Sequence, residues 1–228
     1  MNTHFFEQHQ KQIISLILAG LATLLISSLW QGAMEINWHN VFDTSSIEYY
    51  VVWHVRLPRI LAALLVGGGL AISGAVMQGL FRNPLVEPGI IGVSSGAALF
   101  AAATIVLGTH IAPKIFALLG DYALPIAACI GGWLVTSVLY LFSRNKRGIS
   151  ISSMLLIGIA INAFTGALIG LLTFIASETE LRSLTFWSMG SLSSFNYQKI
   201  LIIVAVQIIL VPLPVSYTHL TLPTTERV

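Results

Sequence analysis

The chain has 228 residues, of which 56% are hydrophobic and only 9% are charged, and its formal net charge is +2. Soluble domains carry about 25% charged residues, so this composition excludes an ordinary soluble domain and predicts an all-α integral membrane protein. The Lys and Arg residues are scattered rather than gathered in a stripe, which excludes a nucleic-acid-binding surface.

Six apolar stretches follow one another along the chain, and each approaches the length that crosses a bilayer. The first is longer than the hydrophobic region of a secretory signal and no small-x-small cleavage site follows it, so we expect a retained span. We therefore predict that residues 1–215 form a polytopic helical bundle. Its predicted spans are 13–29, 60–80, 90–107, 123–142, 151–175 and 200–214, the last of them short.

Two connectors between the spans are more polar and carry aromatic residues. Residues 30–55 include Trp30, Trp38 and Trp53, which is typical of a segment at a membrane interface. Residues 177–196 have apolar side chains at helical spacing but are too polar to span, which favours a short interfacial helix. Lys and Arg divide equally between the two sides of the bundle, so the charge count alone does not orient the chain.

Residues 216–228 differ in character from the rest of the chain, because apolar sequence gives way to SYTHLTLPTTERV. Such a segment has no apolar face to bury against a bundle, so we expect a non-native or disordered tail. The alternative is an ordinary cytoplasmic tail that follows a shortened sixth span.

Arg56 and Arg59 lie in the motif RLPR, just before the second predicted span. Arginines at the end of a span commonly extend to lipid headgroups, and this is one interpretation. The other is that both bind an acidic partner at the external rim, where we expect them to lie together because only two residues separate them. Pro58 disfavours a helical conformation at Leu57, so we expect a non-helical backbone there.

The residues from Gly92 to Gly96 match the pattern G-x-S-x-G, which in hydrolases exposes a nucleophilic serine between a strand and a helix. Here the pattern opens an apolar stretch and no histidine lies in a compatible context, so Gly92 and Gly96 are predicted to serve close helix packing. The sequence has no phosphate-binding loop, no H-E-x-x-H and no Cys/His cluster. We therefore expect no catalytic residue, metal ligand or cofactor on this chain, so that energy must come from a partner or an ion gradient.

Four small or polar residues recur at intervals of four in the fifth predicted span and therefore share one helix face. They are Gly158, Asn162, Gly166 and Gly170. One interpretation is a close contact between helices with the Asn162 amide hydrogen-bonded across it. The other is the wall of a translocation path, since polar groups inside membranes tend to cluster there.

Several motifs together resemble the iron-chelate and cobalamin (FecCD-type) permease family of bacterial ATP-binding cassette importers. They are RLPR, GGGLAISGAVMQGLFRNPLVEPGIIGVSSGAA, LLIGIAINAF and FWSMGSLSS, and the resemblance covers residues 10–215. It implies a ten-span permease with a cytoplasmic N-terminus, of which this chain would be the N-terminal part. The implied partners are a second permease subunit, two cytoplasmic ATPase subunits that use ATP and Mg²⁺, and an external substrate-binding protein, all at the bacterial inner membrane.

The resemblance also implies roles for individual residues. Arg56 and Arg59 would dock the binding protein, and the face with Gly158, Asn162 and Gly166 would line the translocation path at the dimer interface. Residues Ser183 to Ser194 would form a short external helix. The turn after the second span would consist of Arg82, Asn83 and Pro84 and would lie on the cytoplasmic side.

The leading functional expectation is a permease subunit for an iron(III)-siderophore or a related iron chelate, which works by alternating access. The alternatives are a heme or cobalamin importer of the same family, or a transport-inactive fragment, because four spans and a coupling segment of the family are absent. Two further classes are less favoured. An ion-coupled carrier would need buried acidic residues, and an intramembrane enzyme would need a convergent nucleophile and base.

Overall fold

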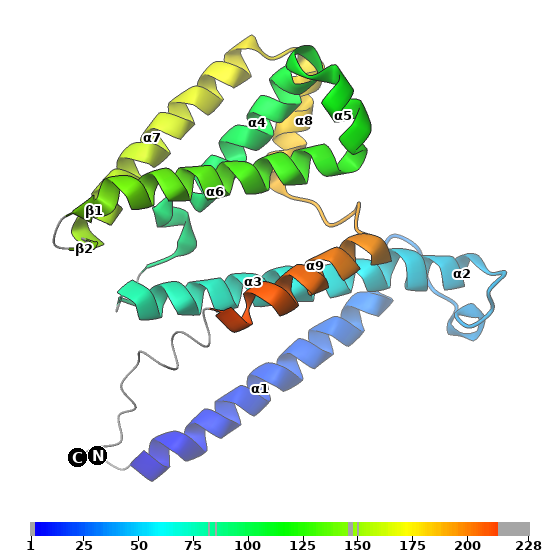
Figure 1. The fold of residues 1–228 in the computed structure, drawn as a ribbon. Coiled ribbons are helices and arrows are strands. Elements are labelled where there is room, and N and C mark those ends of the chain that lie inside the picture. Colours follow the sequence, from blue (N-terminus) through cyan, green and yellow to red (C-terminus); the bar gives the residue numbers. More distant parts are fainter. Residues whose placement is uncertain (1–2, 82, 85, 146–147, 150, 214–228) are drawn as a thin grey trace. The chain divides into compact units, whose positions relative to one another are not determined.

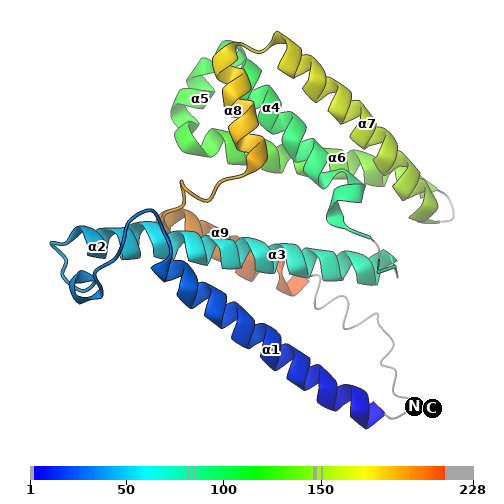
Figure 2. The same cartoon turned by 180° about the vertical axis from the view of Figure 1, so that it is seen from behind.

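The computed structural model describes residues 3–81, 83–84, 86–145, 148–149 and 151–213, and these residues are almost entirely helical (Figures 1 and 2). The α-helices are α1 (Thr3–Trp30), α2 (Ile47–Tyr50), α3 (Leu57–Phe81), α4 (Val93–Ile111), α5 (Pro113–Leu119), α6 (Ala123–Ser143), α7 (Ile151–Ile175), α8 (Glu178–Met189) and α9 (Tyr197–Leu210). The other elements are η1 (Trp38–Asn40), η2 (Val51–Arg56), η3 (Pro88–Ile91), η4 (Gly120–Tyr122), β1 (Arg144–Asn145) and β2 (Gly148–Ile149).

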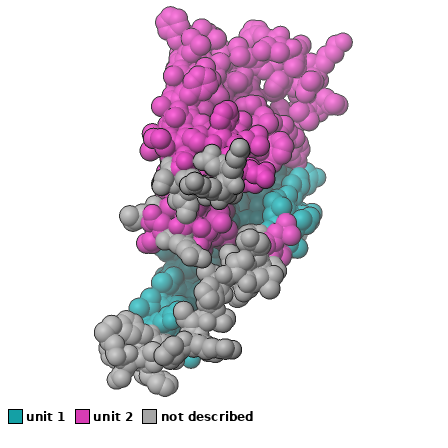
Figure 3. Space-filling view, turned by 60° about the vertical axis from the view of Figure 1, so that its left-hand side comes forward, with its two compact units in different colours: residues 1–69, 192–210 teal, residues 70–191, 211–228 magenta. Residues whose placement is uncertain are grey.

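The chain forms two compact units, which Figure 3 colours separately. Unit 1 holds residues 1–69 and 192–210, and unit 2 holds residues 70–191 and 211–228. The division falls inside α3, directly after three consecutive glycines at 67–69.

Unit 1 is built around a continuous helical stretch from Ile47, through the π-helix η2, into α3. In this unit α9 lies beside the first half of α3, and the Gln207 side-chain amide donates to the Leu65 carbonyl at 2.7 Å (Figures 1 and 2). At the start of α9 the Tyr197 hydroxyl donates to the Trp53 carbonyl. Polar groups therefore hold α9 near both ends of its contact with the continuous stretch of η2 and α3. Packing of small apolar side chains alone would do little to select one position of the two helices over another.

Unit 2 is a bundle in which α4 packs against both α6 and α7. One core cluster consists of Phe81, Val86, Ile91 and Leu139, and Leu139 is completely buried. A second cluster consists of Ala102, Val106 and Leu172. The first cluster joins the end of α3 to η3, α6 and α7, so the turn after α3 is held by apolar burial.

In the part of the chain that the structure describes, four helical stretches have the length and apolar composition to cross a membrane. They are His9–Trp30, Ile47–Phe81, Pro113–Ser143 and Ser153–Ile175, and the shorter apolar helices are Val93–Gly108 and Tyr197–Leu210. Their outward faces carry large exposed apolar side chains, such as Leu16, Leu141 and Phe174, which suits a lipid solvent. The prediction of an all-α polytopic membrane protein is confirmed.

Several predicted boundaries differ from the observed ones. Residues 90–92 do not belong to the third span, because Gly92 has a left-handed backbone (φ +82°) and α4 begins at Val93. The short helix expected at residues 183–194 is α8 at Glu178–Met189, which begins after Ser177 and ends at Gly190 with φ +74°. The sixth apolar helix is α9, which begins at Tyr197 and not at residue 200.

A short antiparallel hairpin was not expected from the sequence. Arg144 pairs with Ile149, and Asn145 pairs with Gly148, so the chain reverses between α6 and α7. Three sequence predictions lie outside the described residues: the end of the sixth span at residue 214, the tail 216–228 and the position of Arg82.

Candidate functional site

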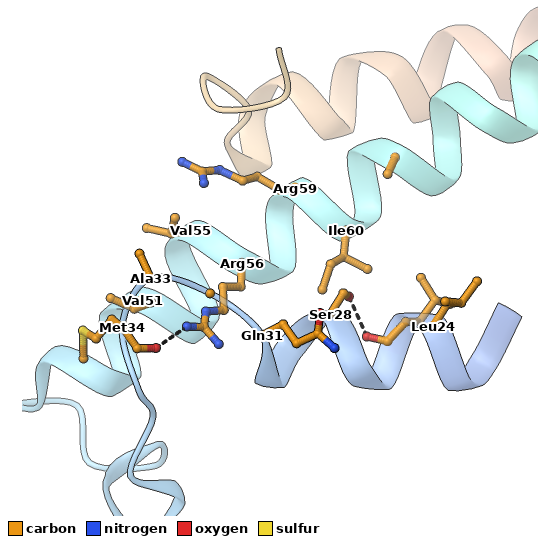
Figure 4. Close-up of a pocket in the computed structure, with 13 residues that line it drawn as sticks. Leu24, Ser28, Gln31, Ala33, Met34, Val51, Val55, Arg56, Arg59 and Ile60 are labelled. Carbon is orange, nitrogen blue, oxygen red and sulfur yellow. Dashed lines mark hydrogen bonds between the residues drawn. The ribbon is translucent and has the colours of Figure 1, made fainter. Parts of the chain in front are cut away.

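A cavity of about 560 Å³ lies in unit 1, where the end of α1 meets η2 and the start of α3 (Figure 4). Leu24, Leu25, Ile60 and Ala63 form part of its apolar wall. Its polar side is lined by Ser28, Gln31, Arg56 and Arg59. Both arginines of the RLPR motif therefore border this cavity.

The half-buried Arg56 side chain is bound to backbone carbonyls of the same chain. Its Nη1 atom donates to the Leu29 carbonyl at 2.5 Å, and its Nη2 atom donates to the Met34 carbonyl at 2.6 Å. Leu29 lies in the last turn of α1, where carbonyl groups lack partners within the helix. A Cβ atom at Gly32 would lie 2.5 Å from Arg56 Nη2, so the glycine leaves room for the guanidinium group.

The backbone in the RLPR motif contradicts the expectation of a non-helical conformation before the proline. Leu57 is helical (φ −60°, ψ −46°), although it precedes Pro58. The preceding turn is a π-helix in which the Leu57 N–H donates to the Val52 carbonyl, five residues back. Proline has no N–H and its ring crowds the carbonyl four residues back, and the wider π-turn relieves this crowding while the helix continues. Pro58 itself is fully buried.

Arg59 has different surroundings from Arg56. Figure 4 shows that the Arg56 side chain points toward the loop that holds Met34, whereas Arg59 leaves the other side of the helix. Arg59 is exposed, and within the described part of the chain it makes no hydrogen bond or ion pair. The two guanidinium groups are close in sequence, but they do not form one cluster.

A polar junction in unit 2 joins α7 to the start of α4. The Ser95 hydroxyl lies 2.6 Å from Asn162 Oδ1 and donates to it, and the Asn162 side-chain N–H donates to the Gly89 carbonyl at 3.4 Å. Ser95 also lies 3.1 Å from the Gly92 carbonyl, which offers its hydroxyl a second acceptor. The junction spans η3, α4 and α7, so one amide fixes where α4 begins.

The face of α7 that includes Asn162 is divided into two parts. Gly158 is buried and Asn162 is half-buried, whereas Gly166 and Gly170 are exposed. A Cβ atom added at Gly166 or Gly170 would meet nothing within 4 Å. Among the described residues, therefore, the structure brings only the first half of the face into a helix contact.

Glycines carry the crossing of α4 and α6. A Cβ atom at Gly96 would lie 2.5 Å from the Gly131 carbonyl oxygen, and one at Gly131 would collide with the Gly96 carbonyl oxygen. Beside them, a Cβ atom at Gly92 would lie 3.1 Å from Val135 Cγ1. The two backbones approach more closely than any side chain would allow, which is the usual role of small residues in membrane helices.

The G-x-S-x-G pattern does not form a nucleophile elbow. Ser94 lies in the first turn of helix α4, and His110 lies near the other end of the same helix. Sixteen helical residues separate them by about 24 Å, so this histidine cannot serve as the base for this serine. Among the described residues, no group of three His, Cys, Asp or Glu side chains could hold a metal ion.

The start of α8 carries the clearest electrostatic feature of unit 2. The Ser177 N–H donates to Glu180 Oε2 at 2.8 Å in a capping box, and this hydrogen bond lowers the pKa of the Glu180 carboxyl. His110 Nε2 lies 3.8 Å from Glu180 Oε1 and assists when it is protonated. Helix α8 is therefore capped at its N-terminus and linked there to the end of α4.

The sequence interpretation missed several partners of these residues. Gln207 is an amide inside an apolar stretch, and that isolation is a signal for an interhelical hydrogen bond. Ser95 has no motif signal of its own, because Ser94 occupies the motif position. The carbonyl groups that bind Arg56 have no sequence signal, since every residue has a backbone carbonyl.

Asn83 and Pro84 lie in the turn after α3, where the Gln78 amide donates to the Pro84 carbonyl at 3.1 Å.

Comparisons with known proteins agree on one family. The sequence profile of the FecCD transport family matches residues 13–222. The hemin transport system permease protein HmuU of Yersinia pestis is 39% identical over 194 residues, which are 83% of this chain and 56% of the relative. The vitamin B12 import system permease protein BtuC of Klebsiella pneumoniae is 37% identical over 199 residues, which are 86% of this chain and 56% of the relative.

A solved structure is also similar to the chain. It is an inward-facing conformation of a metal-chelate type ABC transporter, with a TM-score of 0.69 and 35% sequence identity. The match covers 93% of this chain and 66% of that one. The chain thus spans about 56% of the length of the curated relatives that it matches. The profile match also extends past residue 215.

Proposed function

Because the chain belongs to the FecCD transport family, we propose that it supplies membrane-spanning helices to an ATP-driven importer of a metal macrocycle, hemin or vitamin B12. The observation that carries this proposal is the match to the family over residues 13–222. The chain itself performs no covalent chemistry in this proposal. ATP and Mg²⁺ are used by separate ATPase subunits, and the site of action is the bacterial inner membrane.

The named relatives support macrocycles more than the iron(III)-siderophores that the sequence motifs first suggested. One relative is a hemin permease and another is a vitamin B12 permease, at 39% and 37% identity. Both cargoes hold their metal inside a large organic macrocycle. The leading expectation of a siderophore importer therefore gives way to its alternative, and a siderophore becomes a comparison cargo for the experiment.

The open half of the α7 face is our candidate for the contact with a second permease subunit or for the wall of the path. Gly166 and Gly170 are exposed and have free space above them, in a helix that is otherwise strongly apolar. Small residues let a second helix approach closely or leave a passage open. Alternating access would then arise from movement between the subunits on either side of this face.

The external binding protein is proposed to dock at the RLPR motif. An exposed Arg59 offers a charge that can attract an acidic surface and increase the rate of docking. No acidic residue of the described chain already neutralises Arg59. The remaining partners, a second permease subunit and two ATPase subunits, belong to the same proposal.

Proteoliposomes provide the test. They should contain the chain, in one arm as it stands and in another extended to the length of its relatives, together with the ATPase subunits and the binding protein. Uptake of hemin, cyanocobalamin and a ferric siderophore is measured with ATP, with a non-hydrolysable ATP analogue and with an ionophore. We expect ATP-dependent uptake of one macrocycle that the ionophore leaves unchanged.

Other outcomes would identify a different class of protein. Uptake that ignores ATP and collapses with the ionophore would indicate an ion-coupled carrier. Selective uptake of the siderophore would restore the first expectation. Hydrolysis of a substrate that is lost in Ser94→Ala would indicate an intramembrane enzyme.

A further inference from the structure

Helix α8 is joined to another helix of unit 2 by one ion pair. His110 Nε2, in the last turn of α4, lies 3.8 Å from Glu180 Oε1, in the first turn of α8. The hydroxyls of Ser183, Thr185 and Ser188 all donate to carbonyls of α8 itself. Among the described residues, the ion pair is therefore the one polar contact between α8 and another helix.

The rest of the contact between α8 and unit 2 is apolar and encloses a cavity. Leu184 packs against the core cluster of Ala102, Val106 and Leu172. Helices α4, α7 and α8 together line a cavity of about 380 Å³, to which Ala102, Ile169 and Leu184 contribute. Since apolar packing has little directional preference, the ion pair at the start of α8 determines how firmly this wall of the cavity is held.

We propose that His110 and Glu180 form a pH-dependent latch, which holds the start of α8 against the end of α4 when the imidazole is protonated and the carboxyl is ionised. An imidazole changes its charge between about pH 5 and 8, and a Glu carboxyl does so near about pH 4.3. The latch should therefore be strongest at about pH 5 to 6 and weaker on either side. It does not depend on the cargo or on the partners of the proposed function.

The two groups contribute to the stability of the contact with opposite signs. The His110 side chain is 74% exposed, so protons from the medium reach the pair. A protonated imidazole gains an acidic partner only in the folded contact, so its effect is present at low pH and is lost as the pH rises. The Ser177 N–H lowers the pKa of the Glu180 carboxyl, so the effect of the carboxylate is present at high pH and is lost in acid. Their combination gives a maximum.

The other titratable groups near α4 do not replace Glu180. On the elements that pack against α4 they are Lys114 of α5, Cys129 and Tyr140 of α6, and Glu178 and Arg182 of α8, while η3 and α7 carry none. Within the described part of the chain, none of them forms an ion pair with His110. A protonated His110 also stabilises the end of its own helix, so the test must read α8 and not α4.

Hydrogen exchange of residues 178–182 in detergent, corrected for intrinsic rates, tests the latch. In the wild type we expect exchange about two- to fivefold faster at about pH 7.5 than at about pH 5.5, since an exposed ion pair is worth a factor of that size. His110→Gln should remove this difference, and His110→Arg, which carries a permanent charge, should give slow exchange at both pH values. The matched control is His39→Gln, which alters an exposed histidine of unit 1 and should keep the difference.

A second measurement follows access to the cavity. Ala102 is 2% exposed and lines the cavity together with α8, so Ala102→Cys is labelled with a neutral thiol reagent after Cys129 has been replaced by serine. At about pH 5.5, His110→Gln should label about two- to fivefold faster than the chain that keeps His110. At about pH 7.5 the two rates should be equal. Each comparison is made at one pH, so the ionisation of the thiol cancels.

Three results would overturn the latch. They are equal exchange of residues 178–182 in the wild type at the two pH values, the same pH dependence in His110→Gln, and a pH dependence confined to the end of α4. The last result would mean that His110 stabilises only its own helix. Both measurements read the motion of α8 and not transport, so a failure of uptake would concern only the proposed function.

Discussion

Single residues decide how closely the helices of unit 2 approach each other. Gly96 and Gly131 meet backbone to backbone, Asn162 joins three elements, and Gly166 and Gly170 face open space. Residue types that the sequence presents as one pattern therefore have different energetic roles.

Gly96→Ala should destabilise the chain by about 1–3 kcal/mol, because the new methyl group would lie 2.5 Å from the Gly131 carbonyl oxygen and force α4 and α6 apart. Gly166→Ala is the matched control, since its methyl group meets nothing within 4 Å. Reversible unfolding in mild detergent measures the free energy of unfolding of both variants. Equal stability of the two variants would mean that the α4 and α6 crossing is looser than described.

Asn162→Leu should cost about 1–3 kcal/mol, because the Gly89 carbonyl loses its partner and Ser95 must turn back to the Gly92 carbonyl. Ser95→Ala should cost less, since Asn162 keeps its bond to Gly89. A double-mutant cycle in the same unfolding assay measures the coupling between the two side chains. Strictly additive effects would contradict a direct hydrogen bond.

At the scale of elements, helices in this protein are fixed by polar contacts near their ends. The start of α8 is capped by Ser177 and Glu180, and α9 is attached to α3 by one amide. Between apolar helices in lipid, such contacts select one register among several of similar packing energy. Each contact can be removed without a large change in side-chain volume.

The capping box should make the first turn of α8 sensitive to acid. Because the pKa of Glu180 is lowered in the folded state, its stabilising effect is complete above the pKa of an unfolded Glu, about 4.3, and is lost as the pH falls below it. Hydrogen exchange of residues 178–182 is compared at several pH values, with rates corrected for intrinsic exchange.

The control for this prediction is Glu180→Gln, which keeps an acceptor for the Ser177 N–H but cannot titrate. In Glu180→Gln, the protection of residues 178–182 against hydrogen exchange should not change between neutral and acidic pH. The His110→Gln background removes the contribution of protonated His110. The same acid dependence in wild type and Glu180→Gln would exclude this carboxyl as the cause.

Gln207→Leu should weaken the contact of α9 with α3 by about 0.6 kcal/mol and at most about 1.7 kcal/mol, the range found for interhelical hydrogen bonds in membranes. Ile208→Leu is the matched control, because Ile208 is 67% exposed and faces away from the contact. Disulfide cross-linking between cysteines placed on α3 and α9 measures the separation. Unchanged cross-linking would show that packing alone holds the pair.

At the scale of the whole molecule, the number of apolar helices between two loops determines whether the loops share a side of the membrane. Ser45 and Ser194 are separated by α3, α4, α6 and α7, whereas α3 alone separates Ser45 from Asn83. An even number of crossings returns the chain to the same side. Two crossings likewise connect Asn83 with Arg144.

Single cysteines at these four positions should therefore label in two pairs with a membrane-impermeant maleimide. We expect Ser45→Cys and Ser194→Cys to label from outside the cell, and Asn83→Cys and Arg144→Cys only after the membrane is opened. The native Cys129, which is exposed, is first replaced by serine. Labelling of both Ser45→Cys and Asn83→Cys from outside would show that α3 does not cross.

The sequence by itself determined the class of protein and the number of apolar helices. Length and apolar composition are sufficient for this, because a bilayer rewards any continuous apolar helix of the right length, whatever its neighbours are. The same holds for the family, since its motifs are read along the chain, and the match over residues 13–222 confirms the resemblance. The ends of α6 and α7 also lie within one residue of the predicted spans 123–142 and 151–175.

Only the tertiary structure decided which polar groups meet. It placed Arg56 on two carbonyls, Asn162 on Ser95, and Gln207 on α3, over separations of 22 to 142 residues. It also kept Leu57 helical through a π-turn that the rule for residues before proline does not foresee. Local sequence sets the cost of a backbone conformation or of an unpaired polar group. The partner that offsets this cost comes from another helix, so it exists only once the helices are packed together.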